Sequence, residues 1–296
     1  MKSRATTFLT IRTRASDFIE LAKPRLNALV IATTAVGYYM GTDNNINVLT
    51  FIHTLIGTAL VAGGASAINQ VLERDVDALM QRTKMRPIPC GRLRPTEGMG
   101  FGLTLSMLGL FQLAFGANIL ASALALATLV AYISVYTPLK RLSSSATIIG
   151  AVPGAFPPVI GWVAARGTLT AEAVTLFAIV FLWQVPHFFA VAWVWREDFK
   201  KAGFLFLPVI DASGQRTARQ IILFSIALFP VSLTPTLMGF AGNTYLVGAG
   251  FLSSSFIILT FRFAMDRTSK RARSLFLGSL VYLPLLWGLM IAERAL

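Results

Sequence analysis

Cysteine, histidine and charged residues are scarce in this sequence. Among 296 residues there are one cysteine, Cys90, and two histidines, His53 and His187. A single cysteine excludes an internal disulfide bond, and so few ligands exclude a metal cluster of the cysteine–histidine type. Only 13% of the residues are charged, whereas soluble domains carry about a quarter. These shortages argue against a soluble, disulfide-stabilised or metal-cluster domain.

Long apolar runs take the place of the missing charges. Hydrophobic residues make up 55% of the chain, and they gather in runs of roughly 18–22 residues, the length of a helix that crosses a bilayer. We expect an all-α polytopic membrane protein with nine transmembrane helices. The predicted spans cover residues 26–41, 49–68, 98–116, 118–136, 145–165, 171–193, 221–240, 243–261 and 274–292. Glycine and proline between residues 150 and 158 predict a distorted fifth span.

The basic residues fall on one side of this nine-span arrangement. Of all lysines and arginines, only Arg166 and Arg294 lie in segments on the other side. Because cytoplasmic loops are enriched in Lys and Arg, we expect a cytoplasmic N-terminus and an outer C-terminus, in a bacterial inner membrane. The same asymmetry explains the net charge of +13 without a nucleic-acid partner. No acidic residue lies near the middle of a span, which argues against an ion-coupled transporter.

The topology divides the chain into two segments. Residues 1–25 are expected to form a cytosolic tail and interfacial segment, since residues 1–21 lack the apolar core of a secretory signal peptide. Residues 26–296 are expected to form a single transmembrane domain around a central cavity. Residues that carry chemistry are then expected at the cytoplasmic ends of the spans.

Three oxygen-bearing side chains, Asn69, Glu73 and Asp77, follow one another at intervals of four residues at the end of the second span. On a helix they lie on one face. Mg²⁺ takes carboxylate oxygens and shares its coordination shell with substrate phosphates, so the stripe favours a site where Mg²⁺ bridges protein and diphosphate. An ordinary charged helix end, with the acids paired to Arg74 and Arg82, explains the pattern equally well.

Basic and aromatic residues in nearby loops supply candidate ligands for a diphosphate. They are Arg82, Lys84, Arg86, Tyr136, Lys140 and Arg141. Arginine binds phosphate oxygens in a bidentate manner, and lysine supplies a compact charge. The usual enrichment of cytoplasmic loops in basic residues, and of membrane interfaces in tyrosine, also accounts for them. It does not account for the position of Arg82, Lys84 and Arg86 directly after the acidic stripe.

The sixth span contains His187 and precedes a second acidic pair, Glu197 and Asp198. Histidine inside a membrane is costly and tends to be functional. His187 is therefore a candidate for binding an iron porphyrin or the polar edge of a substrate. A buried histidine bonded to a neighbouring helix explains it equally well. His53, near the outer end of the second span, is expected to be interfacial.

Together these motifs resemble the UbiA superfamily of intramembrane prenyltransferases. The resemblance rests on Asn-x-x-x-Glu-x-x-x-Asp at 69–77, on Arg-Thr and Arg-Pro within 82–87, and on Tyr-Thr-Pro-Leu-Lys-Arg at 136–141. Pro-His-Phe at 186–188 and Arg-Glu-Asp-Phe at 196–199 extend it to the subgroup that farnesylates heme. It covers essentially the whole chain in order, and it implies the UbiA-type prenyltransferase fold.

The resemblance also implies an activity and roles for residues. The activity is transfer of the farnesyl group of farnesyl diphosphate to a vinyl group of heme B, with addition of water, giving heme O for a downstream heme A synthase. The implied catalytic residues are Asn69, Glu73, Asp77 and Asp198, of which Glu73, Asp77 and Asp198 bind the Mg²⁺ cofactor. Arg82, Lys140 and Lys84 are implied to neutralise the diphosphate, and His187 to contact the heme.

Two positions depart from the superfamily pattern. Glu73 stands where the superfamily usually has aspartate, and the second site has Glu197 and Asp198 in place of Asp-x-x-x-Asp. The number of Mg²⁺ ions is therefore open. An aromatic acceptor in place of heme, a small-solute transporter and a heme-binding subunit without activity remain as alternatives. Loss of function on substituting Glu73 or Asp77 would separate an enzyme from the last two.

Overall fold

The computed structural model describes residues 13–43 and 45–294, and within these ranges the chain is helical and has no β-strand. The first half contains α1 (Arg14–Ala22), α2 (Pro24–Gly41), α3 (Val48–Leu72), α4 (Arg74–Asp77), α5 (Pro95–Gly116), α6 (Ile119–Val130), the π-helix η1 (Ala131–Tyr136) and α7 (Thr137–Leu139). The second half contains α8 (Ala146–Gly154), α9 (Pro157–Arg166), α10 (Ala171–Val194), α11 (Arg196–Lys201), α12 (Leu207–Ile210), α13 (Gln215–Leu237), α14 (Asn243–Asp266) and α15 (Ser269–Arg294). The predicted tail is described only from residue 13 onward.

Eight helices in the described ranges are long and apolar enough to cross a membrane. They coincide with the second to the ninth predicted spans, from Val48–Leu72 to Ser269–Arg294. The first predicted span, 26–41, matches α2, which is less hydrophobic than these eight. Because α2 packs against α9 and α3, it belongs to the bundle. The total of nine transmembrane spans stays a prediction.

The helix starts are fixed by local side-chain chemistry. Thr13, Asn47 and Asn118 precede α1, α3 and α6, and each side chain accepts a hydrogen bond from a backbone N–H in the first turn. Such caps satisfy donors that have no partner inside the helix. Pro24 and Pro95 begin α2 and α5, where proline costs no hydrogen bond.

The predicted distortion of the fifth span is confirmed. α8 ends at Gly154, and α9 begins at Pro157 after two intervening residues. Proline has no backbone N–H and cannot donate a hydrogen bond to the preceding turn. Pro157 therefore starts a new helix rather than continuing α8. The break directs α8 toward α10 and α9 toward α2.

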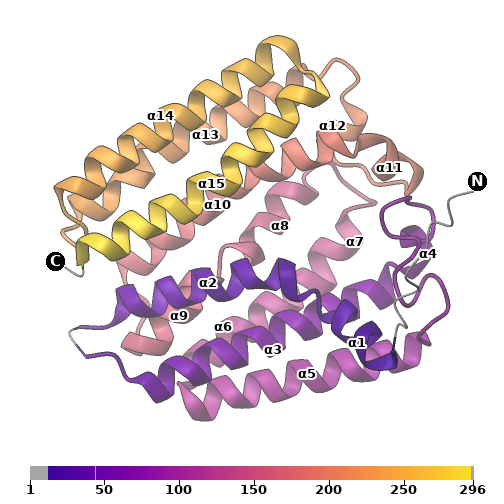
Figure 1. Cartoon of the computed structure of the whole chain (residues 1–296), viewed down its shortest axis with the longest axis horizontal. Coiled ribbons are helices and arrows are strands. Elements are labelled where there is room, and N and C mark those ends of the chain that lie inside the picture. The colour runs from indigo at the N-terminus through magenta and orange to yellow at the C-terminus, as the bar shows by residue number, and fades with distance from the viewer. Residues whose placement is uncertain (1–12, 44, 295–296) are drawn as a thin grey trace, which may run out of the picture.

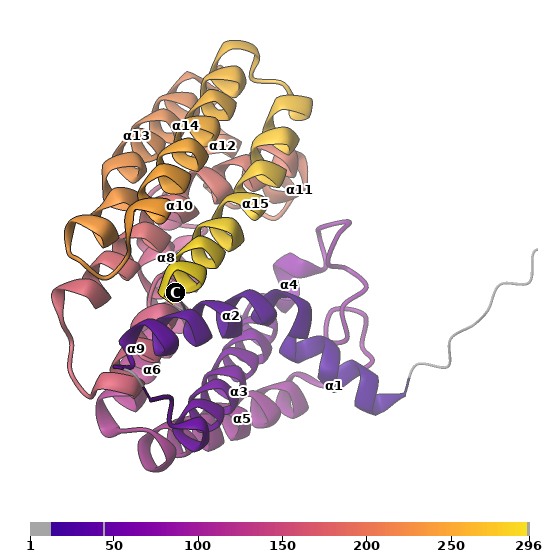
Figure 2. The ribbon, with the colours of Figure 1, turned by 60° about the vertical axis from the view of Figure 1, so that its left-hand side comes forward.

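The bundle places its short helices at one end. In Figures 1 and 2, α4 and α11 lie at the same end of the molecule as α1, and in Figure 1 the C-terminus lies at the opposite end. The segments that follow α3 and α10, far apart in the sequence, therefore meet at one end of the bundle. α10, α13, α14 and α15 form one half, and α2, α3, α5, α6 and α9 form the other (Figure 1).

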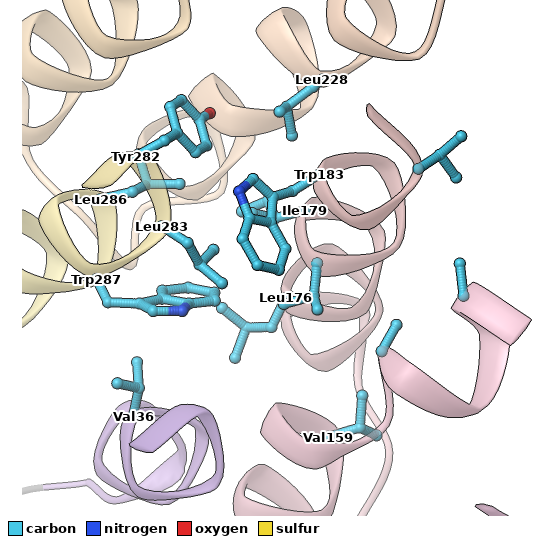
Figure 3. Close-up of a cluster of buried hydrophobic side chains, with 14 of the residues drawn as sticks. Val36, Val159, Leu176, Ile179, Trp183, Leu228, Tyr282, Leu283, Leu286 and Trp287 are labelled. Atoms are coloured by element: carbon cyan, nitrogen blue, oxygen red, sulfur yellow. The ribbon is translucent and has the colours of Figure 1, made fainter. Parts of the chain in front are cut away.

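Large apolar side chains fill the space between the two halves. In Figure 3 the indole of Trp183 points from α10 toward α15, and Trp287 of α15 lies above Val36 of α2. The cluster also contains Val159, Leu176, Ile179, Leu228, Tyr282, Leu283 and Leu286. The members drawn are at most 7% exposed. Close packing of this kind holds the helices in register around the site described next.

Two glycines allow α2 and α9 to approach closely. A Cβ atom on Gly37 would lie 1.9 Å from the carbonyl oxygen of Pro158, and one on Gly161 would lie 2.0 Å from that of Thr34. Small residues at helix contacts let backbones come together, and this packing stabilises helical membrane proteins.

Gly161→Val is therefore expected to separate α2 from α9 and to lower the unfolding temperature in detergent. The cost should be about 1–3 kcal/mol or more, the range for overpacking a well-packed interior. Gly250→Val is the matched control, because a Cβ atom at Gly250 meets nothing within 4 Å. Equal unfolding temperatures for the two variants would contradict this account of the contact.

Candidate active site

The first predicted motif lies at a break between two helices. α3 ends at Leu72, Glu73 has φ −97° and ψ 9°, and α4 begins at Arg74. The predicted helical stripe from Asn69 to Asp77 is therefore interrupted at Glu73, although the Asp77 N–H still donates to the Glu73 carbonyl oxygen at 2.8 Å. In the first half of the stripe the two side chains are neighbours as predicted, because Asn69 Nδ2 donates to Glu73 Oε2 at 2.8 Å. The break gives Asp77 its own set of contacts.

Glu73 is paired with Lys140. The Lys140 Nζ atom donates to Glu73 Oε1 at 2.8 Å and lies 3.4 Å from Asn69 Oδ1. The Lys140 and Glu73 side chains are only 8% and 10% exposed. This buried pair joins the acidic segment 69–77 to the segment 136–141, and its two residues are 67 positions apart in the sequence.

A π-helical turn presents Lys140 to the site. η1 interrupts the α-helical pattern between α6 and α7, and Tyr136 is its last residue. The Lys140 ammonium lies 4.6 Å from the ring centroid of Tyr136 and 5.9 Å from that of Tyr132. Thr137, which sequence analysis did not single out, places its hydroxyl 2.9 Å from Asn69 Oδ1. Short π-helical segments often occur at functional sites.

Asp77 is paired with Arg86. The Arg86 Nη1 atom donates to Asp77 Oδ2 at 2.6 Å, and Asp77 is 1% exposed. Thr83 Oγ1 donates to the Asp77 carbonyl oxygen at 2.8 Å and ties the loop back onto α4. Of the alternative pairing of the acids with Arg74 and Arg82, the part found among the described residues is Arg74 with its neighbour Asp75, whereas Glu73 and Asp77 pair with Lys140 and Arg86.

The acidic segment that contains Asp198 contacts the loop that contains Arg82. The backbone N–H of Arg82 donates to Asp198 Oδ2 at 3.3 Å, and the Arg82 guanidinium lies 5.6 Å from the ring centroid of Phe199. Asp198 lies in α11 after a break at Trp195, just as Asp77 lies in α4 after the break at Glu73. Glu73, Asp77 and Asp198 are all less than 10% exposed.

Two of the predicted diphosphate ligands lie outside this arrangement. Lys84 and Arg141 are exposed, and within the described residues neither forms an ion pair with Glu73, Asp77 or Asp198. The structure thus brings Arg82, Arg86, Tyr136 and Lys140 to the acidic residues and leaves these two in the surrounding surface.

The predicted metal ligands do not form a ready-made cage. Across residues 13–43 and 45–294, no three His, Cys, Asp or Glu side chains are grouped so as to hold a metal ion. The donor chemistry nevertheless fits Mg²⁺, because this metal is usually held by one or two carboxylates together with substrate phosphates. A bound diphosphate would supply oxygens and would compete for Lys140 and Arg86, which now occupy Glu73 and Asp77.

Lys23 lies beside the acidic residues, although the sequence marked it only as one of the cytoplasmic basic residues. Burial, followed by the charges of Arg86 and Lys140, lowers the pKa of Lys23 to about 7, against the opposing effect of Asp77 and Glu73. A lowered lysine pKa indicates that the surroundings of the ammonium are positively charged or shield it from water. Positively charged surroundings of this kind favour the binding of a polyanion.

The backbone holds Lys23 in an unusual conformation. Its φ of 48° lies in the left-handed region, which costs energy for a residue with a side chain. Gln70 Nε2 donates to the Leu21 carbonyl oxygen at 2.8 Å, and Asn27 Nδ2 donates to that of Ala22 at 2.6 Å. Strained residues held by their surroundings are enriched at functional sites. In the sequence, the feature that could have drawn attention to Lys23 is its position directly before Pro24, where α2 begins.

An apolar cavity of about 360 Å³ opens next to the charged residues. Lys140, Tyr132 and Tyr136 contribute to its wall, together with Gln184, His187 and Phe188 of α10. Two predicted diphosphate ligands, Tyr136 and Lys140, and the predicted heme contact His187 therefore face one space. Apolar cavities with a few polar groups are typical of sites for hydrophobic ligands.

His187 is held by α15. Its Nδ1 atom lies 2.7 Å from Ser279 Oγ, and its ring stacks on Trp183 with centroids 4.9 Å apart. The sequence allowed either a histidine bonded to a neighbouring helix or a histidine that binds a ligand. His187 is bonded to α15 and also lines the cavity, so each interpretation is consistent with its position.

The chain is similar to known proteins along nearly its whole length. The model of the UbiA prenyltransferase family matches residues 30–292. A protoheme IX farnesyltransferase of Solibacter usitatus is 46% identical over 287 residues, which cover 94% of this chain and 98% of the relative. The protoheme IX farnesyltransferase of Myxococcus xanthus is 38% identical over 295 residues, 99% of each chain.

Solved structures share the fold. A digeranylgeranylglyceryl phosphate synthase superposes with a TM-score of 0.80 at 18% identity, covering 95% of this chain and 99% of the other. A UbiA homolog from Archaeoglobus fulgidus bound to DMAPP and Mg²⁺ superposes with a TM-score of 0.70, also at 18% identity, covering 95% and 100%. At this level of identity the likeness concerns the fold alone.

Proposed function

The chain belongs to the UbiA prenyltransferase family, and we propose that it transfers the farnesyl group of farnesyl diphosphate to a vinyl group of protoheme IX, with addition of water. The products are heme O and diphosphate. The protein is an integral membrane protein, and relatives at 38–46% identity over nearly the whole chain are protoheme IX farnesyltransferases. The observation that supports the proposal best is the buried Glu73–Lys140 pair beside an apolar cavity.

The charged end of the site is proposed to bind the diphosphate. Arg86, Lys140 and Lys23 supply cations, and Arg82, whose side chain is exposed, adds a further charge beside Asp198. Such donors stabilise negative charge as the diphosphate leaves, and they act strongly in a buried site. Tyr132 and Tyr136 hold the Lys140 ammonium at the cavity wall.

Glu73, Asp77 and Asp198, with Asn69 assisting, are proposed to hold Mg²⁺ when diphosphate is present. The metal would supply Lewis-acid stabilisation of the leaving group. The homolog bound to DMAPP and Mg²⁺ supports this role for the family. The carboxylates of this chain are buried and within reach of its basic residues, so they can exchange cation partners as the substrate enters.

The apolar cavity is proposed to hold the farnesyl chain and the porphyrin edge. Its wall excludes water from the allylic cation formed as the C–O bond to diphosphate breaks. The vinyl π electrons form the new C–C bond, and the cation left on the porphyrin side takes up water and loses a proton. His187 is proposed to contact the heme, since it lines this cavity.

The topology and partners follow from the same proposal. The site residues lie at the end of the bundle that carries α1, α4 and α11, and the basic loops predict that this end faces the cytoplasm of a bacterium. Residues 1–25 then form a tail and interfacial segment, and 26–296 the transmembrane domain. A downstream heme A synthase would consume the product.

The test of the proposed function is conversion of heme B by the purified protein in detergent. With farnesyl diphosphate and Mg²⁺, mass spectrometry of the extracted heme should show the mass of a farnesyl group plus water, and EDTA should prevent the gain. Unchanged heme in folded protein would exclude heme as acceptor. Prenylation of an aromatic acceptor under the same conditions would keep the family activity and change the substrate.

Lys23→Met is expected to raise the KM for farnesyl diphosphate about tenfold, because one charge-assisted contact of roughly 1.5 kcal/mol is lost. The measurement is initial rate of heme O formation against farnesyl diphosphate concentration. Arg25→Met is the matched control, since Arg25 is exposed two residues along the chain. An unchanged KM in Lys23→Met would remove Lys23 from the diphosphate site.

A further inference from the structure

The hydrogen bonds around His187 define which of its ring nitrogens carries the proton. Ser279 Oγ lies 2.6 Å from the carbonyl oxygen of Phe276 and 2.7 Å from His187 Nδ1. A carbonyl oxygen only accepts, so the single hydroxyl hydrogen of Ser279 must point to Phe276. The hydroxyl oxygen then accepts from His187, which places the proton on Nδ1.

The other ring nitrogen keeps its lone pair. With Nδ1 protonated in the neutral ring, Nε2 can only accept a hydrogen bond or bind a metal. Within the described residues no hydrogen bond to His187 Nε2 is present, and the ring lines the apolar cavity. An acceptor on the wall of a cavity and without a protein partner is available to a ligand that enters the cavity.

Aromatic residues fix the plane of the imidazole. Trp183 stacks on it at an interplanar angle of 24°, and Phe188 and Phe276 each lie 5.3 Å away between ring centroids. Trp183 is itself held by a hydrogen bond of 2.9 Å from Nε1 to the Ser279 carbonyl oxygen. Ser279 thus contacts His187 through its hydroxyl and Trp183 through its backbone, and it is fully buried in α15.

We propose that Ser279 is a positioning residue that presents Nε2 of His187 as an axial ligand to the iron of the heme substrate. The inference rests on the proposed function, since it takes heme as the acceptor. A metal-binding histidine almost always donates its second N–H to a nearby oxygen, which sets the tautomer and raises the basicity of the ligating nitrogen. The Nδ1–H donation to Ser279 has this form. The other histidine, His53, is not among the residues that line the cavity.

Iron ligation would orient the porphyrin for the reaction. A single Fe–N bond fixes the height of the macrocycle over α10 and leaves rotation about that bond to be set by the cavity wall. The vinyl group could then reach the farnesyl carbon without any covalent attachment of heme to the protein. Holding reactants in this way supplies much of the rate of a two-substrate reaction.

The test is a heme titration of the purified full chain in detergent, followed by absorption and resonance Raman spectroscopy. Wild-type protein should show a histidine-ligated spectrum, and His187→Gly should lose it and regain it with added imidazole. Ser279→Ala should shift the iron–histidine vibration and weaken heme binding about tenfold or more, the usual cost of losing such a partner. Ser253→Ala is the matched control, a buried serine whose hydroxyl contacts Tyr282 instead.

Each outcome decides the inference. Identical spectra for wild type and His187→Gly, or for wild type and Ser279→Ala, would overturn it, and continued heme O formation by His187→Gly would leave the proposed function in place. Failure of folded wild-type protein both to bind heme and to farnesylate it would overturn the proposed function as well. A change in Ser253→Ala equal to that in Ser279→Ala would show a structural effect only and would also overturn the assignment.

Discussion

Asp77→Asn is expected to lower the rate of farnesyl transfer by about 100-fold or more, the scale of losing a group that stabilises the reacting charge. Asp77 is 1% exposed, and its carboxylate accepts from Arg86 at 2.6 Å. The amide keeps the size of the side chain but removes the negative charge that Mg²⁺ and Arg86 require. The measurement is the rate of heme O formation as a function of Mg²⁺ concentration.

The control for this variant lies two residues away. Asp75 is on the same short helix, but its side chain is 84% exposed, and among the described residues it pairs with Arg74 alone. Asp75→Asn should therefore keep nearly the full rate, because an exposed ion pair contributes little. If both variants lost activity equally, the acidic segment would act through its net charge, and the specific role of Asp77 would be wrong.

Lys140→Met is expected to reduce the rate of farnesyl transfer by about 10² to 10³-fold. Lys140 contacts Glu73 at 2.8 Å, faces two tyrosine rings and lines the cavity. Methionine keeps the apolar stem and removes the charge that would neutralise the leaving diphosphate. Arg141→Met, at the next and exposed position, should leave the rate within a few-fold of wild type. Comparable loss in both variants would mean that loop charge alone matters.

The same substitution separates stability from catalysis. Lys140→Met leaves Glu73 buried without its cation, which should cost about 3–5 kcal/mol of folding free energy. The double variant Glu73→Gln/Lys140→Met removes both charges and should recover most of that stability, while its activity stays low. Unfolding in detergent followed by tryptophan fluorescence measures the first quantity, and the heme assay measures the second. A double variant less stable than Lys140→Met would contradict the pairing.

The fold was largely predictable because a bilayer imposes strong constraints on sequence. Apolar runs gave eight spans that agree with helices such as Val48–Leu72 and Ala171–Val194 to within a few residues. The broken fifth span followed from its prolines. The first span was harder to judge, since α2 carries Asn27, two threonines and two tyrosines and is less hydrophobic. Two of its buried polar residues, Asn27 and Thr33, line the cavity.

The candidate site was predictable in its residue types and less so in its contacts. The spacing of Asn69 and Glu73 correctly predicted neighbours on one helix face. It could not reveal the break at Glu73, because spacing assumes an uninterrupted helix, whereas Glu73 has φ −97° and ψ 9°. Lys23 was missed because its importance comes from distant residues, Arg86 and Lys140, and not from its own neighbours in the chain.

Composition and hydropathy were enough to predict the membrane class, the position of nearly every span and the kinds of charged residue at the ends of the spans. Those features depend on local composition and on short periodicities, which folding does not alter. The contacts of Lys140 with Glu73, of Arg82 with Asp198 and of Ser279 with His187 came from the packing of the helices. These contacts join residues about 70 to more than 100 positions apart, and their geometry exists only after the helices have packed.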